Sequence, residues 1–211
     1  MEENKRVVIS IGRQYCSHGK DVGHKLAEVL EIPYYDKELL ARTAQDSGFS
    51  PEMMQEQDEK PTKSLLYSIV MNTFSYGYPA TMTGLEMPMN QKLFLAQFAT
   101  IKEIAQEGSC VIMGRCADYA LADDPSLFRI FLHASENDRV ELCAKTDGLS
   151  PAKAKDFIHK MDKTRASYYH YYTDREWGKA DNYDLCLNVS QFGVDKAVNM
   201  ILHALRERGL L

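Results

Sequence analysis

The chain has 211 residues, of which 45% are hydrophobic and 26% are charged, and its formal net charge is −5 at pH 7. This length suits a single α/β domain with room for a small inserted subdomain. The negative charge argues against a general nucleic-acid binder, which needs a basic face, and no apolar run approaches the roughly 18–20 residues that cross a bilayer.

The first predicted element is an apolar strand over residues 7–11, followed by a polar loop and by Gly19-Lys20 at the start of an amphipathic helix. Loop N–H groups and the positive end of a helix bind phosphate oxygens, and a lysine in the first turn can reach the β- and γ-phosphates of a nucleotide. This order predicts a phosphate-binding loop. The residues expected at the donor nucleotide are Arg13, Ser17, His18, Gly19, Lys20 and Asp21.

This loop departs from the strict pattern G-x-x-x-x-G-K-[ST]. Gln14 replaces the first glycine, and Asp21 replaces the Ser or Thr that holds Mg²⁺. Two roles for Asp21 stay open: its carboxylate either ligates Mg²⁺ directly or caps the first helical turn, where a negative charge is favourable. The other interpretation of the whole segment is a turn between a core strand and a surface helix, with Lys20 solvated.

The spacing of Val22, Leu26 and Leu30 predicts the first helix, and a short strand follows that ends at Asp36. The long interval at about 47–91 has no strand pattern, and we expect a helical insertion there that covers the acceptor substrate. The alternative is a helical elaboration of the surface.

Three further apolar runs, at residues 110–113, 128–133 and 184–189, are short and nearly continuous, as in strands buried on both faces. Helical patterns alternate with them, with capped starts predicted at Ser135 and Ser150. This alternation predicts an α/β fold in which helices cover both faces of a parallel sheet.

Charged residues follow the predicted strands at the edge where α/β proteins bind ligands. Arg115 comes after a strand and a glycine, and Arg139 lies one turn into the helix after the next strand. A later helix carries a cationic patch over residues 160–165, which is suited to closing over phosphates. The tyrosines at 168–172 are expected to pack against a neighbouring helix more readily than to stack on a base.

Together these motifs resemble the cytidylate kinase-like family of P-loop proteins, relatives of the nucleoside monophosphate kinases. The resemblance covers nearly the whole chain and rests on Ile11-Gly12-Arg13-Gln14-Tyr15 with Ser17-x-Gly19-Lys20, Tyr34-Tyr35-Asp36-Lys37-Glu38-Leu39, Gly114-Arg115-Cys116-Ala117, Asp138-Arg139-Val140, Asp162-Lys163-x-Arg165-Ala166-x-Tyr168-Tyr169 and Tyr183-Asp184-Leu185-x-Leu187-Asn188. It implies a P-loop NTPase-type fold, a single kinase-like domain over residues 1–211, and a lid-like helical segment at about 139–175.

The activity that this resemblance implies is phosphoryl transfer from ATP, with Mg²⁺, to CMP, dCMP or a similar small phosphorylated acceptor. Such an acceptor needs no general base, so catalysis rests on positioning and on neutralising charge. The implied catalytic residues are Lys20, Arg139 and Arg165, and the implied acceptor-binding residues are Asp36, Arg115, Asp162 and Arg165. The family's lid arginines are missing, since Leu142 and Cys143 stand after Arg139.

Two other functions stay open: a catalytically silent nucleotide- or phosphate-sensing protein on the same fold, and a P-loop kinase of another small metabolite. The five cysteines form no C-x-x-C pair, which suits reduced thiols in the cytoplasm. We therefore expect a cytoplasmic protein with ATP and a small acceptor as partners. We expect no nucleic-acid or membrane partner, and a homo-oligomer is compatible with the sequence.

Overall fold

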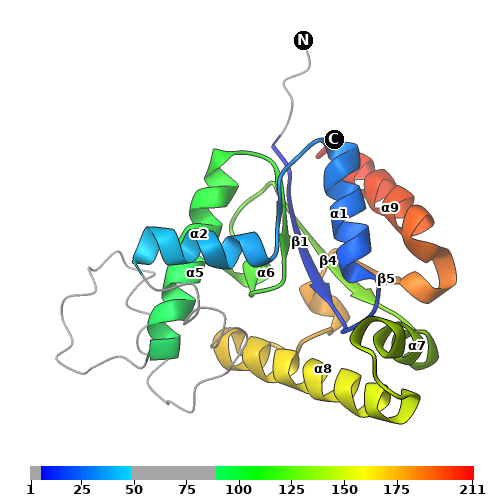
Figure 1. Ribbon diagram of the computed structural model, residues 1–211. Coiled ribbons are helices and arrows are strands. Elements are labelled where there is room, and N and C mark those ends of the chain that lie inside the picture. Colours follow the sequence, from blue (N-terminus) through cyan, green and yellow to red (C-terminus); the bar gives the residue numbers. More distant parts are fainter. Residues whose placement is uncertain (1–5, 49–88) are drawn as a thin grey trace.

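The computed structural model describes residues 6–48 and 89–211 (Figure 1). The insertion predicted at about 47–91 therefore lies almost wholly outside the described residues. The elements are β1 (Val8–Arg13), α1 (Gly19–Leu30), β2 (Tyr34–Tyr35), α2 (Lys37–Ser47), α5 (Met89–Glu107), β3 (Cys110–Met113), α6 (Ala117–Ala120), β4 (Leu127–His133), α7 (Glu136–Asp147), α8 (Pro151–Thr173), a 3₁₀ turn (Ala180–Asn182), β5 (Leu185–Asn188) and α9 (Val189–Glu207).

The five strands form one sheet in the order β2-β3-β1-β4-β5, and every neighbouring pair is parallel. The predicted α/β fold is confirmed. Because all strands run the same way, their carboxyl ends share one edge of the sheet, and β1 lies at its centre. Helices α7 and α8 lie beyond that edge (Figure 1).

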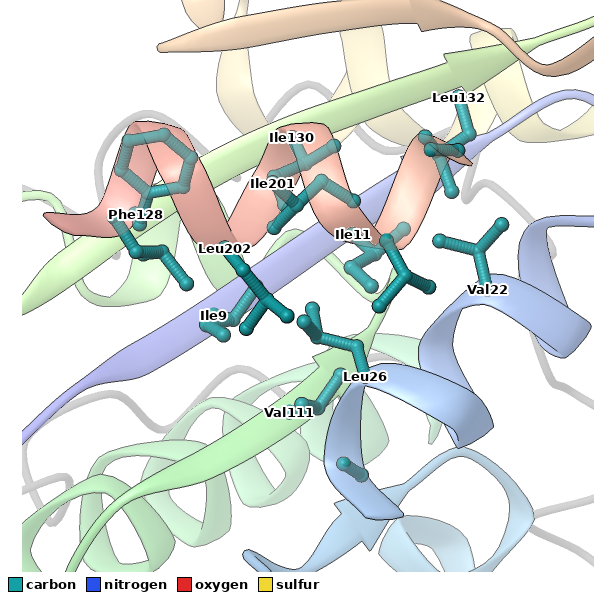
Figure 2. Packing of buried hydrophobic residues seen from close by; sticks show 14 of the residues in the cluster. Ile9, Ile11, Val22, Leu26, Val111, Phe128, Ile130, Leu132, Ile201 and Leu202 are labelled. Atoms are coloured by element: carbon teal, nitrogen blue, oxygen red, sulfur yellow. The ribbon is translucent and has the colours of Figure 1, made fainter. Parts of the chain in front are cut away.

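Alternate residues of the central strand face opposite sides of the sheet and support two hydrophobic cores. Ile9 and Ile11 pack with α1 and α9, as Figure 2 shows for Leu26 and Leu202. On the other side, Val8 packs with residues of α2, α5 and α6. Burial of each such aliphatic side chain contributes about 1.5–3 kcal/mol, so the strand that leads to the loop before α1 is firmly held.

The helix after β4 begins at the predicted cap, where Ser135 Oγ accepts a hydrogen bond from the Asp138 amide at 3.2 Å. The next helix begins at Pro151 after Ser150, as predicted, but the Ser150 side chain forms no capping hydrogen bond. It is one continuous helix of 23 residues that carries both the cationic patch and the tyrosines.

The tyrosines pack as a structural cluster. Tyr172 is stacked on Phe94 of α5 with ring centroids 3.8 Å apart, and Tyr168 contacts the same ring edge-on. This packing joins α8 to α5. No helix in the described ranges is long and apolar enough to cross a membrane.

Candidate phosphate-transfer site

The loop between β1 and α1 is fastened to the end of β4. The Gln14 amide donates to the Leu132 carbonyl at 3.0 Å, and the Gln14 side-chain oxygen accepts from the Ala134 amide at 3.3 Å. Ser17 is buried, and its hydroxyl bonds to the carbonyls of Gln14 at 2.9 Å and Leu132 at 3.4 Å. Gln14, which replaces the expected glycine, thus joins the loop to the carboxyl end of β4.

Close packing explains why the loop needs a glycine at position 19. A Cβ atom on Gly19 would lie 2.7 Å from Arg13 Cβ, closer than real Cβ contacts allow. The loop also holds Cys16 and His18 in the left-handed region, with φ of 54° and 59°. Non-glycine residues adopt this region at some cost, and they concentrate at functional loops.

A cavity of about 700 Å³ lies at the carboxyl edge of the sheet, in front of the N-terminus of α1. Helices α7 and α8 close it on the far side. Its lining comprises residues 13–21, Asp36, Arg115, Leu142, Thr146 and Asp147 of α7, and Met161, Thr164 and Arg165 of α8. The structure thus brings the predicted donor residues together with Asp36, Arg115 and Arg165 around one space.

Asp36 is the buried carboxylate that interacts with three of the cations in this cavity. Its carboxylate lies 2.9 Å from Lys20 Nζ and 3.7 Å from an Arg13 guanidinium nitrogen. Burial by itself would raise the pKa of Asp36, but the Lys20 hydrogen bond and the charges of Arg13, Lys20 and Arg115 outweigh it and lower that pKa. The carboxylate is therefore ionised at neutral pH and holds Lys20 at the cavity floor.

Asp21 lies in the first turn of α1, and its Oδ2 is 2.7 Å from His18 Nδ1. The side chain is 60% exposed and borders the cavity. The carboxylate is thus paired with the ring of the cap residue at the positive end of the helix, where a negative charge is favourable. It also remains within reach of a ligand in the cavity.

Arg139 and Asp162, two of the residues predicted to act on substrate, do not line the cavity. Arg139 is buried, forms an ion pair with Asp162 and donates to the Tyr15 carbonyl at 2.8 Å. Asp162 in turn accepts from the Tyr15 amide at 2.7 Å. Both side chains thus hold the loop to α7 and α8, and their action on a substrate stays a prediction.

We expect Arg139→Met to destabilise the fold by about 2 kcal/mol or more, because Asp162 and the Tyr15 carbonyl each lose a partner in a partly buried site. Urea unfolding measures the loss. The double variant Arg139→Met/Asp162→Asn is expected to lose less than the sum of the single variants. Strictly additive losses would contradict the proposed pairing.

Apart from Arg165, the side chains that α7 and α8 contribute to the cavity wall were not predicted from the sequence. Leu142 and Thr146 are four residues apart on α7, and Met161 and Arg165 are four apart on α8. This spacing places each pair on one helix face. The periodicity was visible in the sequence, but which face meets the cavity depends on how the helices pack. Lys160 and Lys163 of the cationic patch are exposed and do not line it.

A smaller internal cavity lies beside the main one, next to Arg115 and Arg165. Its volume of about 20 Å³ is enough for a single water molecule. Asp118 is buried at its wall and accepts a hydrogen bond from the Tyr169 hydroxyl at 2.6 Å. Burial raises the pKa of Asp118, against the opposing effect of this hydrogen bond and of the Arg175 charge. The Asp118–Tyr169 bond ties α6 to α8.

The model of the cytidylate kinase-like family matches residues 8–191. Comparison with curated proteins gives no significant match. The solved structure of an uncharacterized protein from Eubacterium ventriosum ATCC 27560 is similar at a TM-score of 0.71 and 27% identity, over 95% of this chain and 99% of that chain.

Two kinases are similar to this chain in fold alone. Shikimate kinase from Bacteroides thetaiotaomicron has a TM-score of 0.55 at 13% identity, over 95% of this chain and 98% of that chain. A gluconokinase from Sinorhizobium meliloti 1021 has a TM-score of 0.54 at 16% identity, over 97% of this chain and 94% of that chain. The fold is thus that of P-loop kinases.

Proposed function

The chain belongs to the cytidylate kinase-like family, and on that basis we propose that it transfers the γ-phosphoryl group of ATP to a small phosphorylated acceptor. A CMP- or dCMP-like nucleotide is our leading candidate. The observation that carries this proposal is the convergence of Arg13, Lys20, Arg115 and Arg165 on one cavity around a single buried carboxylate, Asp36. The lining also carries the exposed carboxylates Asp21 and Asp147, so four cations face three carboxylates, and this surplus of positive charge suits a site where several phosphate groups meet.

We assign roles to three of the four cations from their positions. Lys20 lies in the first turn of α1, and together with the amides of the preceding loop it would hold the donor phosphates. Arg115 borders the cavity from the loop after β3 and Arg165 borders it from α8, and we assign both to the acceptor phosphate. The charge of incoming phosphates would take the place of Asp36 beside Lys20, which frees the lysine to follow the group being transferred.

Mg²⁺ fits the donor side of this cavity. In kinases the ion is bound through one or two carboxylates together with substrate phosphates, and the exposed Asp21 carboxylate at the cavity rim supplies such an oxygen. When bound, Mg²⁺ neutralises phosphate charge. Asp21 would then exchange its contact with His18 for the ion, and Arg139 and Asp162 would keep the loop in position from behind.

The test is ADP formation from ATP and Mg²⁺ across a panel of acceptors: CMP, dCMP, UMP, AMP, shikimate and gluconate, with a control lacking acceptor. We expect the highest kcat/KM with a pyrimidine monophosphate. ATP binding without ADP formation from any acceptor would support the silent sensor instead.

One observation favours a second candidate, a kinase whose acceptor is a hydroxyl group. Asp36 is ionised and borders the cavity, so it is placed to accept the proton of an attacking hydroxyl. A phosphate acceptor does not need that step. Turnover with shikimate or gluconate exceeding turnover with every nucleotide would favour this candidate.

We expect Arg115→Lys to weaken acceptor binding roughly tenfold and ATP binding much less, because lysine keeps the charge but loses the planar fork that binds two oxygens. Isothermal titration with CMP and with a non-hydrolysable ATP analogue measures both affinities. Equal weakening of the two ligands would show that Arg115 does not distinguish acceptor from donor.

A further inference from the structure

A cluster of three metal-ligating side chains lies where the phosphate loop meets α7. The sulfur atoms of Cys16 and Cys143 and a carboxylate oxygen of Asp147 all lie within 4.8 Å of one another. Cys143 and Asp147 are four residues apart on α7, so they share one helix face, and the Cys143 thiol donates to Asp147 Oδ2 at 3.3 Å. No part of the proposed kinase mechanism uses these groups.

The three side chains of the cluster differ in their solvent exposure. Cys143 is fully buried, Cys16 is half-buried and Asp147 is exposed. Cys16 and Asp147 also line the large cavity, so an ion can reach the cluster from there and can keep a water ligand on that side. The site therefore has both a fixed inner ligand and a path of entry.

The ligand types select the ion. Thiolate sulfur suits Zn²⁺ and related borderline-soft cations, whereas Mg²⁺ prefers oxygen ligands in an octahedron. A tetrahedral Zn²⁺ with Zn–S bonds of about 2.3 Å places its ligand atoms roughly 3.5–4 Å apart, so only a small contraction of the cluster is needed.

Neighbouring groups would support a bound ion. The Tyr15 hydroxyl donates to Asp147 Oδ2 at 3.2 Å and so orients the carboxylate. Burial, with the neighbouring Asp147, raises the pKa of both thiols, so a bound ion must displace their protons, and the nearby Arg139 charge opposes this rise. Two thiolates and a carboxylate around a divalent ion leave one net negative charge, which Arg139 would offset. Such outer partners are a regular feature of protein metal sites.

We propose that Cys16, Cys143 and Asp147 form a binding site for Zn²⁺ or a similar borderline-soft divalent cation, which links the phosphate loop to α7. Cys16 lies in the middle of the loop that follows β1, so an ion bound to it restrains that loop. One consequence rests on the proposed kinase function: the bound ion would hinder ATP binding and inhibit phosphoryl transfer.

The test is a titration of the reduced, nucleotide-free protein with Co²⁺ and then Zn²⁺. Co²⁺ bound to thiolates gives a sulfur-to-cobalt charge-transfer absorption whose intensity follows the number of sulfur ligands. We expect one Co²⁺ per chain, displaced by Zn²⁺ and not by excess Mg²⁺. Cys143→Ser should weaken this absorption and lower the affinity roughly tenfold or more. Cys186→Ser, which removes the exposed thiol of β5, should change neither.

Asp147→Asn provides an independent variant, because its side chain is exposed and its replacement leaves the core intact. It should lower the Co²⁺ affinity roughly tenfold while circular dichroism and the melting temperature stay unchanged. The proposal is overturned if no charge-transfer absorption develops, or if Asp147→Asn binds Co²⁺ as wild type does. Since no nucleotide is present, either result stands apart from the outcome of the kinase assay.

Discussion

Replacing Lys20 by methionine is expected to lower kcat for phosphoryl transfer by about 10²–10³-fold, because it removes a cation aimed at the charge that develops in the transition state. The side chain is 53% exposed, so the fold should remain intact. Initial rates of ADP formation, with circular dichroism of the same sample, measure the two effects separately.

Lys25→Met is the matched control. Lys25 lies on the same helix and forms an exposed ion pair with Asp195 outside the cavity, so its loss should leave kcat unchanged and cost at most about 1 kcal/mol of stability. A Lys20→Met variant that turns over within a few-fold of wild type would remove Lys20 from the mechanism.

Asp36→Asn is expected to have the largest effect on stability. The side chains of Asp36 and Arg13 are each only 9% exposed, and Lys20 and Arg115 add their charges to the same carboxylate. Asparagine keeps the volume but leaves these cations without their counter-charge. We expect a loss of about 3 kcal/mol in the free energy of unfolding at pH 7, measured by urea denaturation.

The pH dependence of this loss follows from the direction of the pKa shift. Because folding lowers the pKa of Asp36, the carboxylate contributes its stability above the unfolded pKa of about 3.9, and the contribution disappears as the pH falls through the lower folded value. The difference between wild type and Asp36→Asn should therefore be largest at neutral pH and shrink below about pH 4. A difference that stays constant from pH 7 to pH 3 would contradict the assignment.

The sequence predicted what depends on local pattern. The apolar run at Cys110–Met113 became β3 with the predicted bounds, and the predicted strand, loop and helix at the start of the chain are β1, the loop after it and α1. The rule that parallel strands end at one edge brought Asp36 and Arg115 to the same cavity. These features follow from hydrophobic periodicity and from the position of charged residues after strands.

What the sequence did not predict depends on packing between distant segments. The contact of Lys20 with Asp36 requires β2 to lie beside β3, and the meeting of Cys16 with Cys143 requires α7 to fold back over the loop. Arg139 carried the same signal as Arg115, a charge after a buried strand, yet only its tertiary neighbours reveal that it supports the loop. No pattern within a single element encodes these pairings.

If one cavity brings the ATP γ-phosphate to an acceptor phosphate, the transferred group must appear in a new phosphoanhydride, which ³¹P NMR of the products detects. In a mixture of ATP, Mg²⁺, CMP and enzyme, we expect new phosphoanhydride resonances of CDP to grow at the same rate as those of ADP. With Lys20→Met these signals should be absent over the same period. Two results would contradict the proposed transfer. In one, ADP appears together with an equal amount of free phosphate and no CDP. In the other, no new phosphoanhydride forms with CMP or with any other nucleoside monophosphate used in its place.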